Sequence, residues 1–67
     1  MTQREKLGIR IAQVRESKKI SAYELSLRIH RADNYMYYIE TGRTNFRIDN
    51  LFAICDALEI SPKELFD

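Results

Sequence analysis

Apolar and polar residues recur with a helical period along most of the chain. From residue 4 to 17, Leu7, Ile11 and Val14 follow one another at intervals of four and three, the pattern of a helix with one buried face. The same kind of spacing recurs downstream and predicts five helices, at about residues 4–17, 21–29, 33–41, 48–58 and 62–66. We therefore expect an all-α fold class, with a single compact five-helix domain spanning residues 1–67 and no strands.

The inward faces of these helices supply the predicted core. Gly8 lies beside this face in the first helix. Glycine costs a helix roughly 1 kcal/mol relative to alanine, so we expect Gly8 to mark the close approach of another helix. The core should comprise Leu7, Ile11, Val14, Ala22, Leu25, Ile29, Met36, Ile39, Leu51, Ile54, Cys55, Leu58, Ile60 and Leu65.

Local signals mark where the helices begin and end. Ser21 followed by Glu24, and Ser61 followed by Glu64, each predict a capping box, the second with a proline at the first helical position. Gly42 stands where a helix favours a left-handed residue just past its end.

We expect the rest of the chain to hold residues 21–42 in place. They predict two short helices joined by a tight turn, with Met36 and Ile39 of the second helix facing inward. Its outward face has an asparagine and phenols but no lysine, which offers the hydrogen bonds and flat apolar contact that base edges need. At least one tyrosine is expected to pack against the protein instead. The residues assigned to the outside are Asp33, Asn34, Tyr35, Tyr37, Tyr38 and Thr41.

Charge is distributed unevenly along the 67 residues, although the net charge is only +1. Residues 1–47 sum to +5 and residues 48–67 to −4. A basic front and an acidic back suit a protein that docks one face on a polyanion, although small domains also acquire such splits by chance.

Other function classes find little support in the composition. One cysteine excludes an internal disulfide and fits a reducing, cytoplasmic setting. There is no apolar run of membrane-spanning length and no signal-peptide core. One histidine and one cysteine make no metal site. We expect no cofactor, no small-molecule substrate and no catalytic residues, because the chain offers no nucleophile–base pair and a domain of this size little pocket.

Four fragments at these spacings carry a resemblance to a known family. They are Leu-Gly-x-Arg-Ile-x-x-x-Arg at 7–15, Ser-x-x-Glu-Leu at 21–25, Ile-Glu-x-Gly-Arg at 39–43 and Leu-x-x-Ile-x-x-x-Leu-x-Ile-Ser-Pro at 51–62. Together they resemble the helix-turn-helix domain of the phage repressor and Cro (XRE) family. The resemblance implies a five-helix, lambda-repressor-like fold and a bacterial or phage transcription regulator that often binds operators as a dimer.

The resemblance also implies two groups of DNA contacts and one structural pair. Arg15 and Glu40 fall where many members pair the first helix with the recognition helix. The base contacts are expected from Asp33, Asn34, Tyr35 and Tyr38. The phosphate contacts are expected from Ala22, Thr41, Arg43, Asn45 and Arg47 by position, and from Ser21, Tyr23 and Tyr37 by their own chemistry and placement.

The sequence departs from the family pattern at four positions. His30 replaces the usual glycine of the turn, where a positive φ strains a histidine. Ala32 replaces the usual capping Ser or Thr, so Asp33 is expected to cap the recognition helix. Ala22 replaces a glutamine and Phe46 a proline.

Several site residues keep two interpretations. Asn34 either bonds adenine or is solvated, and Asp33 either accepts from cytosine or caps the helix. Arg28 and Arg31 flank the turn and either assist binding or are solvated. Of the apolar residues off the core stripes (Ile9, Leu27 and Phe52), Phe52 is assigned with Ile60 and Phe66 to homodimer contact.

Two hypotheses of function follow. The first is a sequence-specific regulator of transcription that binds double-stranded DNA, a repressor acting as a weak dimer on a palindromic operator. The alternative is a protein-interaction module, antitoxin-like or regulator-binding, that retains the helix-turn-helix fold and uses its tyrosine-rich face.

Overall fold

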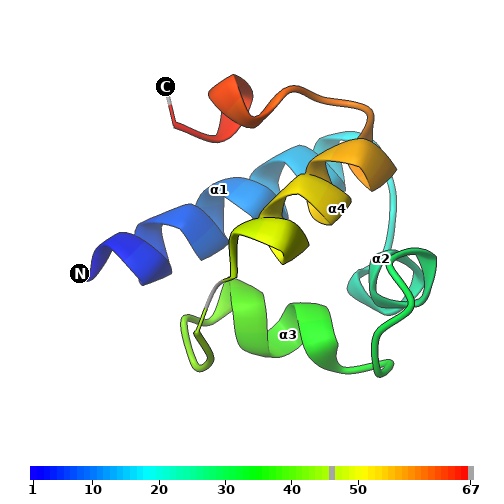
Figure 1. The fold of residues 1–67 in the computed structure, drawn as a ribbon, viewed down its shortest axis with the longest axis horizontal. Helices are drawn as coiled ribbons and strands as arrows, with labels where there is room; N and C mark the ends of the chain where they lie inside the picture. Colours follow the sequence, from blue (N-terminus) through cyan, green and yellow to red (C-terminus); the bar gives the residue numbers. More distant parts are fainter. Residues whose placement is uncertain (46, 67) are drawn as a thin grey trace.

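Helices account for all the regular secondary structure in residues 1–45 and 47–66, which the computed structural model describes (Figure 1). The α-helices are α1 (Gln3–Ser17), α2 (Ala22–Arg28), α3 (Tyr35–Glu40) and α4 (Ile48–Leu58). The fifth element, η1 (Pro62–Leu65), is a single 3₁₀ turn. The all-α expectation is confirmed, with four α-helices in place of five. The substitution of Phe46 for proline lies outside the described residues.

The helices form a core around α3 and α4. α3 packs against α1 and α2, and α4 packs against α2 and η1. Figure 1 shows α3 at one side of the molecule and η1 at the opposite side. Nine predicted core side chains are 5% exposed or less: Ile11, Leu25, Met36, Ile39, Leu51, Ile54, Cys55, Leu58 and Leu65. The other five lie half-buried at the margin of the core: Leu7, Val14, Ala22, Ile29 and Ile60.

The two predicted capping boxes differ in outcome. At η1 the amide of Ser61 donates to Glu64 Oε2 at 3.1 Å, as expected. At α2 the Ser21 hydroxyl accepts from the Glu24 amide at 3.0 Å, but the Glu24 carboxylate pairs with Arg28 one turn later. The second half of that prediction is wrong, because a carboxylate and a guanidinium four residues apart on a helix attract each other.

The recognition helix begins later than predicted. α3 starts at Tyr35 instead of Asp33, because the Tyr35 amide donates to Ala32 O at 3.0 Å and closes a turn ahead of the helix. The prediction that Asp33 caps this helix is therefore wrong. Asn34 occupies the cap position, and its side chain makes no capping hydrogen bond within the described residues.

Left-handed backbone occurs where the sequence predicted it. His30 has a φ of 61° in the turn between α2 and α3, and Gly42 has a φ of 73° just past α3. Lys19 and Glu59 also have positive φ, at 60° and 59°. Neither of these was predicted. Both follow the end of a longer helix, where a left-handed residue commonly ends the hydrogen-bond ladder.

Candidate nucleic-acid interface

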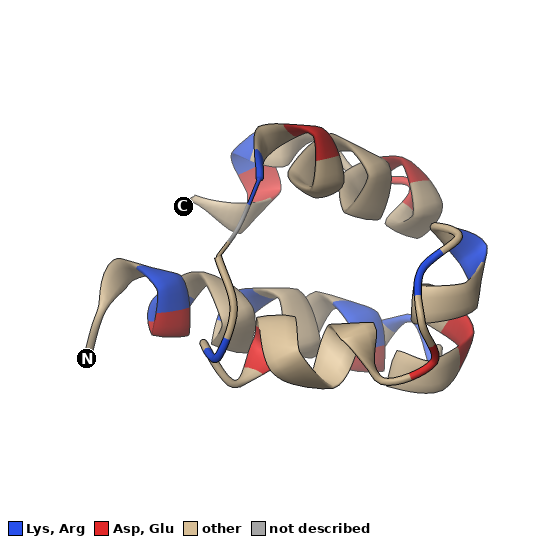
Figure 2. Ribbon diagram, turned by 60° about the horizontal axis from the view of Figure 1, so that its bottom comes forward, with Lys and Arg blue, Asp and Glu red and all other residues tan. Residues whose placement is uncertain are grey.

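The outward surface of α3 is aromatic and uncharged. Tyr37 and Tyr38 are 51% and 41% exposed, and their rings meet edge to face at 5.5 Å. Figure 2 shows both basic and acidic residues on α1 and η1, acidic residues along α4, basic residues in the loops, and an α3 without charge until Glu40 at its end. A partner that contacts this helix meets hydroxyl groups and flat rings, with cations only at its edges.

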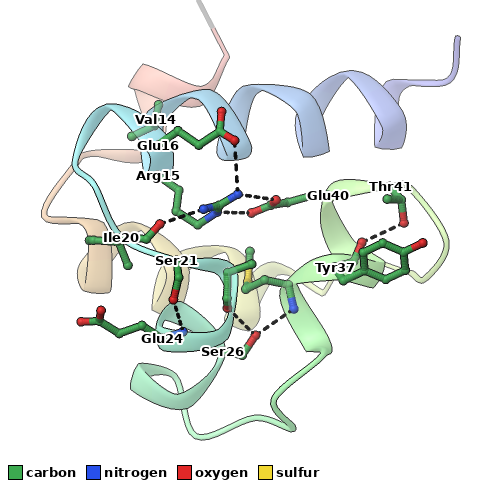
Figure 3. A network of polar contacts seen from close by, with 12 residues as sticks. Val14, Arg15, Glu16, Ile20, Ser21, Glu24, Ser26, Tyr37, Glu40 and Thr41 are labelled. Carbon is green, nitrogen blue, oxygen red and sulfur yellow. Dashed lines mark hydrogen bonds and ion pairs between the residues drawn. The ribbon is translucent and has the colours of Figure 1, made fainter.

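An ion pair holds the C-terminal end of α3 to α1. The Arg15 guanidinium donates from Nε to Glu40 Oε2 at 2.7 Å and from Nη2 to Glu40 Oε1 at 3.0 Å (Figure 3). It also donates to Ile20 O at 2.7 Å. The pair is largely buried, with both side chains 11% exposed. The hydrogen bonds from Arg15 to Glu40 raise the pKa of the guanidinium above its ordinary value. The two residues that the family pattern pairs are thus in direct contact.

The backbones of α1 and α3 touch at Gly8. A Cβ on this residue would lie 2.6 Å from Ile39 O and 2.7 Å from Glu40 O, closer than real Cβ contacts occur. The expectation that Gly8 marks a close approach is confirmed. Together with the Arg15–Glu40 pair, this contact fixes the end of α3 against α1.

Ser26 holds the N-terminal end of α3. Its hydroxyl donates to Ala22 O at 2.9 Å and accepts from the Met36 amide at 2.9 Å (Figure 3). Met36 is the second residue of α3, so this hydroxyl satisfies an amide that a capping side chain would otherwise take. Ser26 was not among the predicted residues. Its signal was a polar residue next to Leu25 on the inward face of α2.

Arg31 links the turn to both α3 and α4. Its Nη2 donates to Asn50 Oδ1 at 2.5 Å, and its guanidinium lies 5.5 Å from the centre of the Tyr35 ring. Asn50 is only 8% exposed. The outward assignment of Tyr35 is wrong, because its ring packs against the core. Its hydroxyl is buried and has no hydrogen-bond partner among the described residues. Tyr35 is thus the tyrosine that packs inward.

The loop after α3 presents two exposed arginines. Arg43 and Arg47 are exposed, and the Arg43 guanidinium lies 5.6 Å from the centre of the Tyr37 ring. The other two loop candidates are already bonded within the protein. Thr41 donates its hydroxyl to Tyr37 O at 2.8 Å, and Asn45 accepts from Arg4 at 2.9 Å.

The remaining candidates lie at the start of α2 and in the turn before α3. Tyr23 is 58% exposed, whereas Ala22 is half-buried against the core. Ser21 is exposed, with its hydroxyl oxygen already accepting from an amide. Asp33 and Asn34 are exposed in the turn.

The described residues also bear on two other kinds of site. No group of three or more His, Cys, Asp and Glu residues lies close enough to hold a metal ion within this part of the chain. No helix in the described ranges is long and apolar enough to cross a membrane.

Known proteins share this arrangement. A model of the Cro/C1-type helix-turn-helix DNA-binding domain matches residues 10–67. The restriction-modification controller protein C.AhdI from Aeromonas hydrophila is 31% identical, with a TM-score of 0.88 over 92% of this chain and 94% of that chain. The clp gene regulator ClgR from C. glutamicum is 26% identical, with a TM-score of 0.93 over 98% and 86%. The hypothetical transcription factor NHTF from Neisseria, 23% identical, shows the same fold with a TM-score of 0.89 over 96% and 74%. No curated protein matches the sequence.

Proposed function

The chain belongs to the Cro/C1-type helix-turn-helix DNA-binding family, and we propose that it represses transcription by reading one operator sequence. It is a DNA-binding regulator of transcription. In the proposed complex α3 enters the major groove, and the loop after it and the start of α2 contact the backbone on either side. We propose that it acts in the cytoplasm, where a bacterial operator lies, and the bacterial sources of its relatives support this.

The uncharged, exposed surface of α3 is the observation that supports sequence reading. Phosphate contacts carry no sequence information, whereas hydrogen bonds and apolar contacts at base edges do. Tyr38 is exposed on α3, and Asn34 and Asp33 are exposed in the preceding turn. Their side chains can form hydrogen bonds or apolar contacts with base edges. Asn34 can bond adenine through two atoms. Tyr35 is no longer proposed as a base contact, because its hydroxyl is buried.

Phosphate binding is assigned to the cations and hydroxyls beside α3. Arg43 and Arg47 are exposed on the loop that follows the helix, and Tyr37 lies next to Arg43. Tyr23 is exposed at the start of α2. Ser21, Ala22, Thr41 and Asn45 are weaker candidates. Thr41 already donates its hydroxyl within the protein, Ser21 and Asn45 are held by bonds that their oxygens accept, and alanine has no polar side-chain atom.

We propose that two copies bind together as a weak homodimer. Ile48 and Phe52 lie one turn apart on α4 and are 62% and 48% exposed, and Phe66 after η1 is 64% exposed. Apolar side chains this exposed are candidates for self-association. Two copies would read half-sites about one helical turn of DNA apart, which predicts a palindromic operator.

Selection from a random-sequence duplex library tests this function. The protein is incubated with the library at low and at moderate salt, and the retained DNA is sequenced. We expect enrichment of a palindrome with half-sites roughly 10–11 base pairs apart. Retention without enrichment would contradict sequence reading. No retention at low salt would favour the alternative of a protein-interaction module and would make a partner pull-down the next experiment.

A further inference from the structure

We propose that Arg31 is a positioning residue that sets the angle of α3 on the DNA and so determines sequence specificity, instead of binding a phosphate. This inference rests on the proposed function. The sequence left two roles for Arg31, assistance in binding or a solvated side chain. Its contacts in the structure point to a third.

The contacts of Arg31 reach three elements. Its backbone amide donates to Ser26 O at 2.9 Å, which ties the turn to α2. Its guanidinium donates to Asn50 Oδ1 in the first turn of α4 and lies over the ring of Tyr35, the first residue of α3. One planar group therefore connects the start of the recognition helix to the core helix behind it.

α3 depends on such external contacts for its orientation. It has only six residues, far fewer than the roughly 12–15 that an isolated helix needs for marginal stability. Its C-terminal end is fixed to α1 by the Glu40 pair and the Gly8 contact. Its N-terminal end has no side-chain cap within the described residues, and Ser26 and Arg31 hold it instead.

The hydrogen bond between Arg31 and Asn50 depends on the burial of Asn50 and on the shape of the guanidinium. Asn50 is largely buried, so losing the arginine would leave its carbonyl oxygen without this donor. We expect lysine to replace the arginine poorly, because its single ammonium lacks the planar fork of donors that can face the Tyr35 ring and donate to Asn50 at the same time. The proposed role therefore depends on a guanidinium, whereas a phosphate contact would require only a positive charge.

The two roles predict different losses on DNA. A phosphate ligand strengthens binding to every sequence and adds about one unit to the slope of log K against log salt. A positioning residue acts on the base contacts of α3. Its loss therefore weakens binding to the operator and leaves binding to unrelated DNA unchanged. The ratio of the two affinities therefore separates the roles.

The experiment compares wild type, Arg31→Gln, Arg31→Lys and Arg28→Gln on the selected operator and on a shuffled duplex over a range of salt. Arg28→Gln is the matched control, because Arg28 is an exposed arginine of α2 that pairs with Glu24 and contacts neither α3 nor α4 through a hydrogen bond or ring. We expect both Arg31 variants to lower the operator-to-shuffled ratio about tenfold. The salt slope should match that of Arg28→Gln, and the control should keep the wild-type ratio.

A double-mutant cycle with Asn50 tests whether Arg31 affects specificity through its hydrogen bond to Asn50. Asn50→Leu alone should lower the ratio by a similar factor, and the double variant should lose little more, because each change breaks the same contact. Losses that multiply in the double variant would overturn the proposal. Thermal unfolding of every variant checks that it is folded. If Arg31→Gln unfolds, Arg31→Lys replaces it in the comparison, because it changes the side chain but retains the positive charge.

Two further results would also overturn the proposal. One is an equal loss on both duplexes with a slope lower by about one unit than that of Arg28→Gln, which would make Arg31 a phosphate ligand. The other is an unchanged ratio in both Arg31 variants. A wild-type ratio of one would instead refute the proposed function, and with it this role, so the two failures are distinguishable.

Discussion

Arg15 and Glu40 form a two-point ion pair, at 2.7 and 3.0 Å, between the last turn of α1 and the last residue of α3. The pair is largely buried, and the other carboxylate near Arg15, that of Glu16, is exposed and more distant, at 3.8 Å. The ion pair stabilises the protein and orients the helix that we assign to base reading. Stability and recognition are therefore coupled in this molecule.

Replacing Glu40 by glutamine should lower the free energy of unfolding by about 3 kcal/mol, because the buried Arg15 would lose its close counter-charge and keep only the exposed Glu16 carboxylate at 3.8 Å. Urea denaturation measures this. The double replacement Arg15→Met with Glu40→Leu should recover most of the loss. Glu24→Gln, which breaks an exposed pair with Arg28, should cost less than about 0.5 kcal/mol. Equal costs for Glu40→Gln and Glu24→Gln would contradict the structural role of the buried pair.

Gly8→Ala should destabilise the protein although alanine favours helices. The added Cβ would meet the carbonyl oxygens of Ile39 and Glu40, and such overpacking costs about 1–3 kcal/mol. This exceeds the gain of roughly 1 kcal/mol in helix propensity. Thermal unfolding of Gly8→Ala, with Gln13→Ala at an exposed position of α1 as the control, checks the prediction. A higher melting temperature for Gly8→Ala would show that the helices can separate freely.

His30→Gly should stabilise the protein by about 0.5–1 kcal/mol. Relief of the left-handed backbone at φ 61° is worth more than the extra chain entropy that glycine loses on folding. The melting temperature should rise by a few degrees for a domain of this size. His30→Ala keeps the Cβ and therefore the strain, so it should show no rise. A gain in both variants would locate the effect in the imidazole and not in the backbone.

The stability of the protein should decrease above about pH 9 through Cys55. Burial raises the pKa of this thiol above its ordinary value of 9.0, so the folded state keeps the proton that the unfolded state releases. The contribution is fully present below pH 9 and is lost as the pH rises toward the folded pKa. Urea denaturation at pH 8 and pH 10 should show a smaller decrease for Cys55→Ala than for wild type. Equal decreases would mean that Cys55 ionises alike in both states.

Asn34→Ala and Arg43→Gln should weaken DNA binding in different ways. Loss of Asn34 should reduce affinity about tenfold on the selected operator only, because its proposed contact is with a base. Loss of Arg43 should reduce affinity on all duplexes and lower the salt slope by about one unit. Titrations on operator and shuffled DNA at several salt concentrations separate the two effects. An equal loss from Asn34→Ala on both duplexes would remove it from the base contacts.

The fold was predictable because it depends on regular signals. Apolar spacing located the helices and the core, and Gly8 and Gly42 marked a close approach and a left-handed end. The start of α3 was missed, because the Tyr35 amide bonds Ala32 O in a turn ahead of the helix and the hydroxyl of Ser26, ten residues before Met36, takes the Met36 amide. No local pattern around Asp33 reveals a partner at that distance.

The site was less predictable than the fold for the same physical reason. Helical spacing alone placed Tyr35 outside, but the Arg31 guanidinium and the core hold its ring inward. The Arg31–Asn50 bond joins residues 19 positions apart, and it depends on how α4 packs behind the turn. Side-chain contacts of this kind follow from tertiary structure and leave no periodic trace in the sequence.

The lack of lysine and arginine in α3 has a consequence for the kinetics of binding. Charges at the edge of an interface govern the rate of encounter, whereas contacts at its centre govern the lifetime of the complex. Arg43 and Arg47 would then set how fast the protein reaches DNA, and α3 would set how long it stays on a given sequence. The two rates could change independently, so substitutions in α3 could retarget the protein without slowing its search.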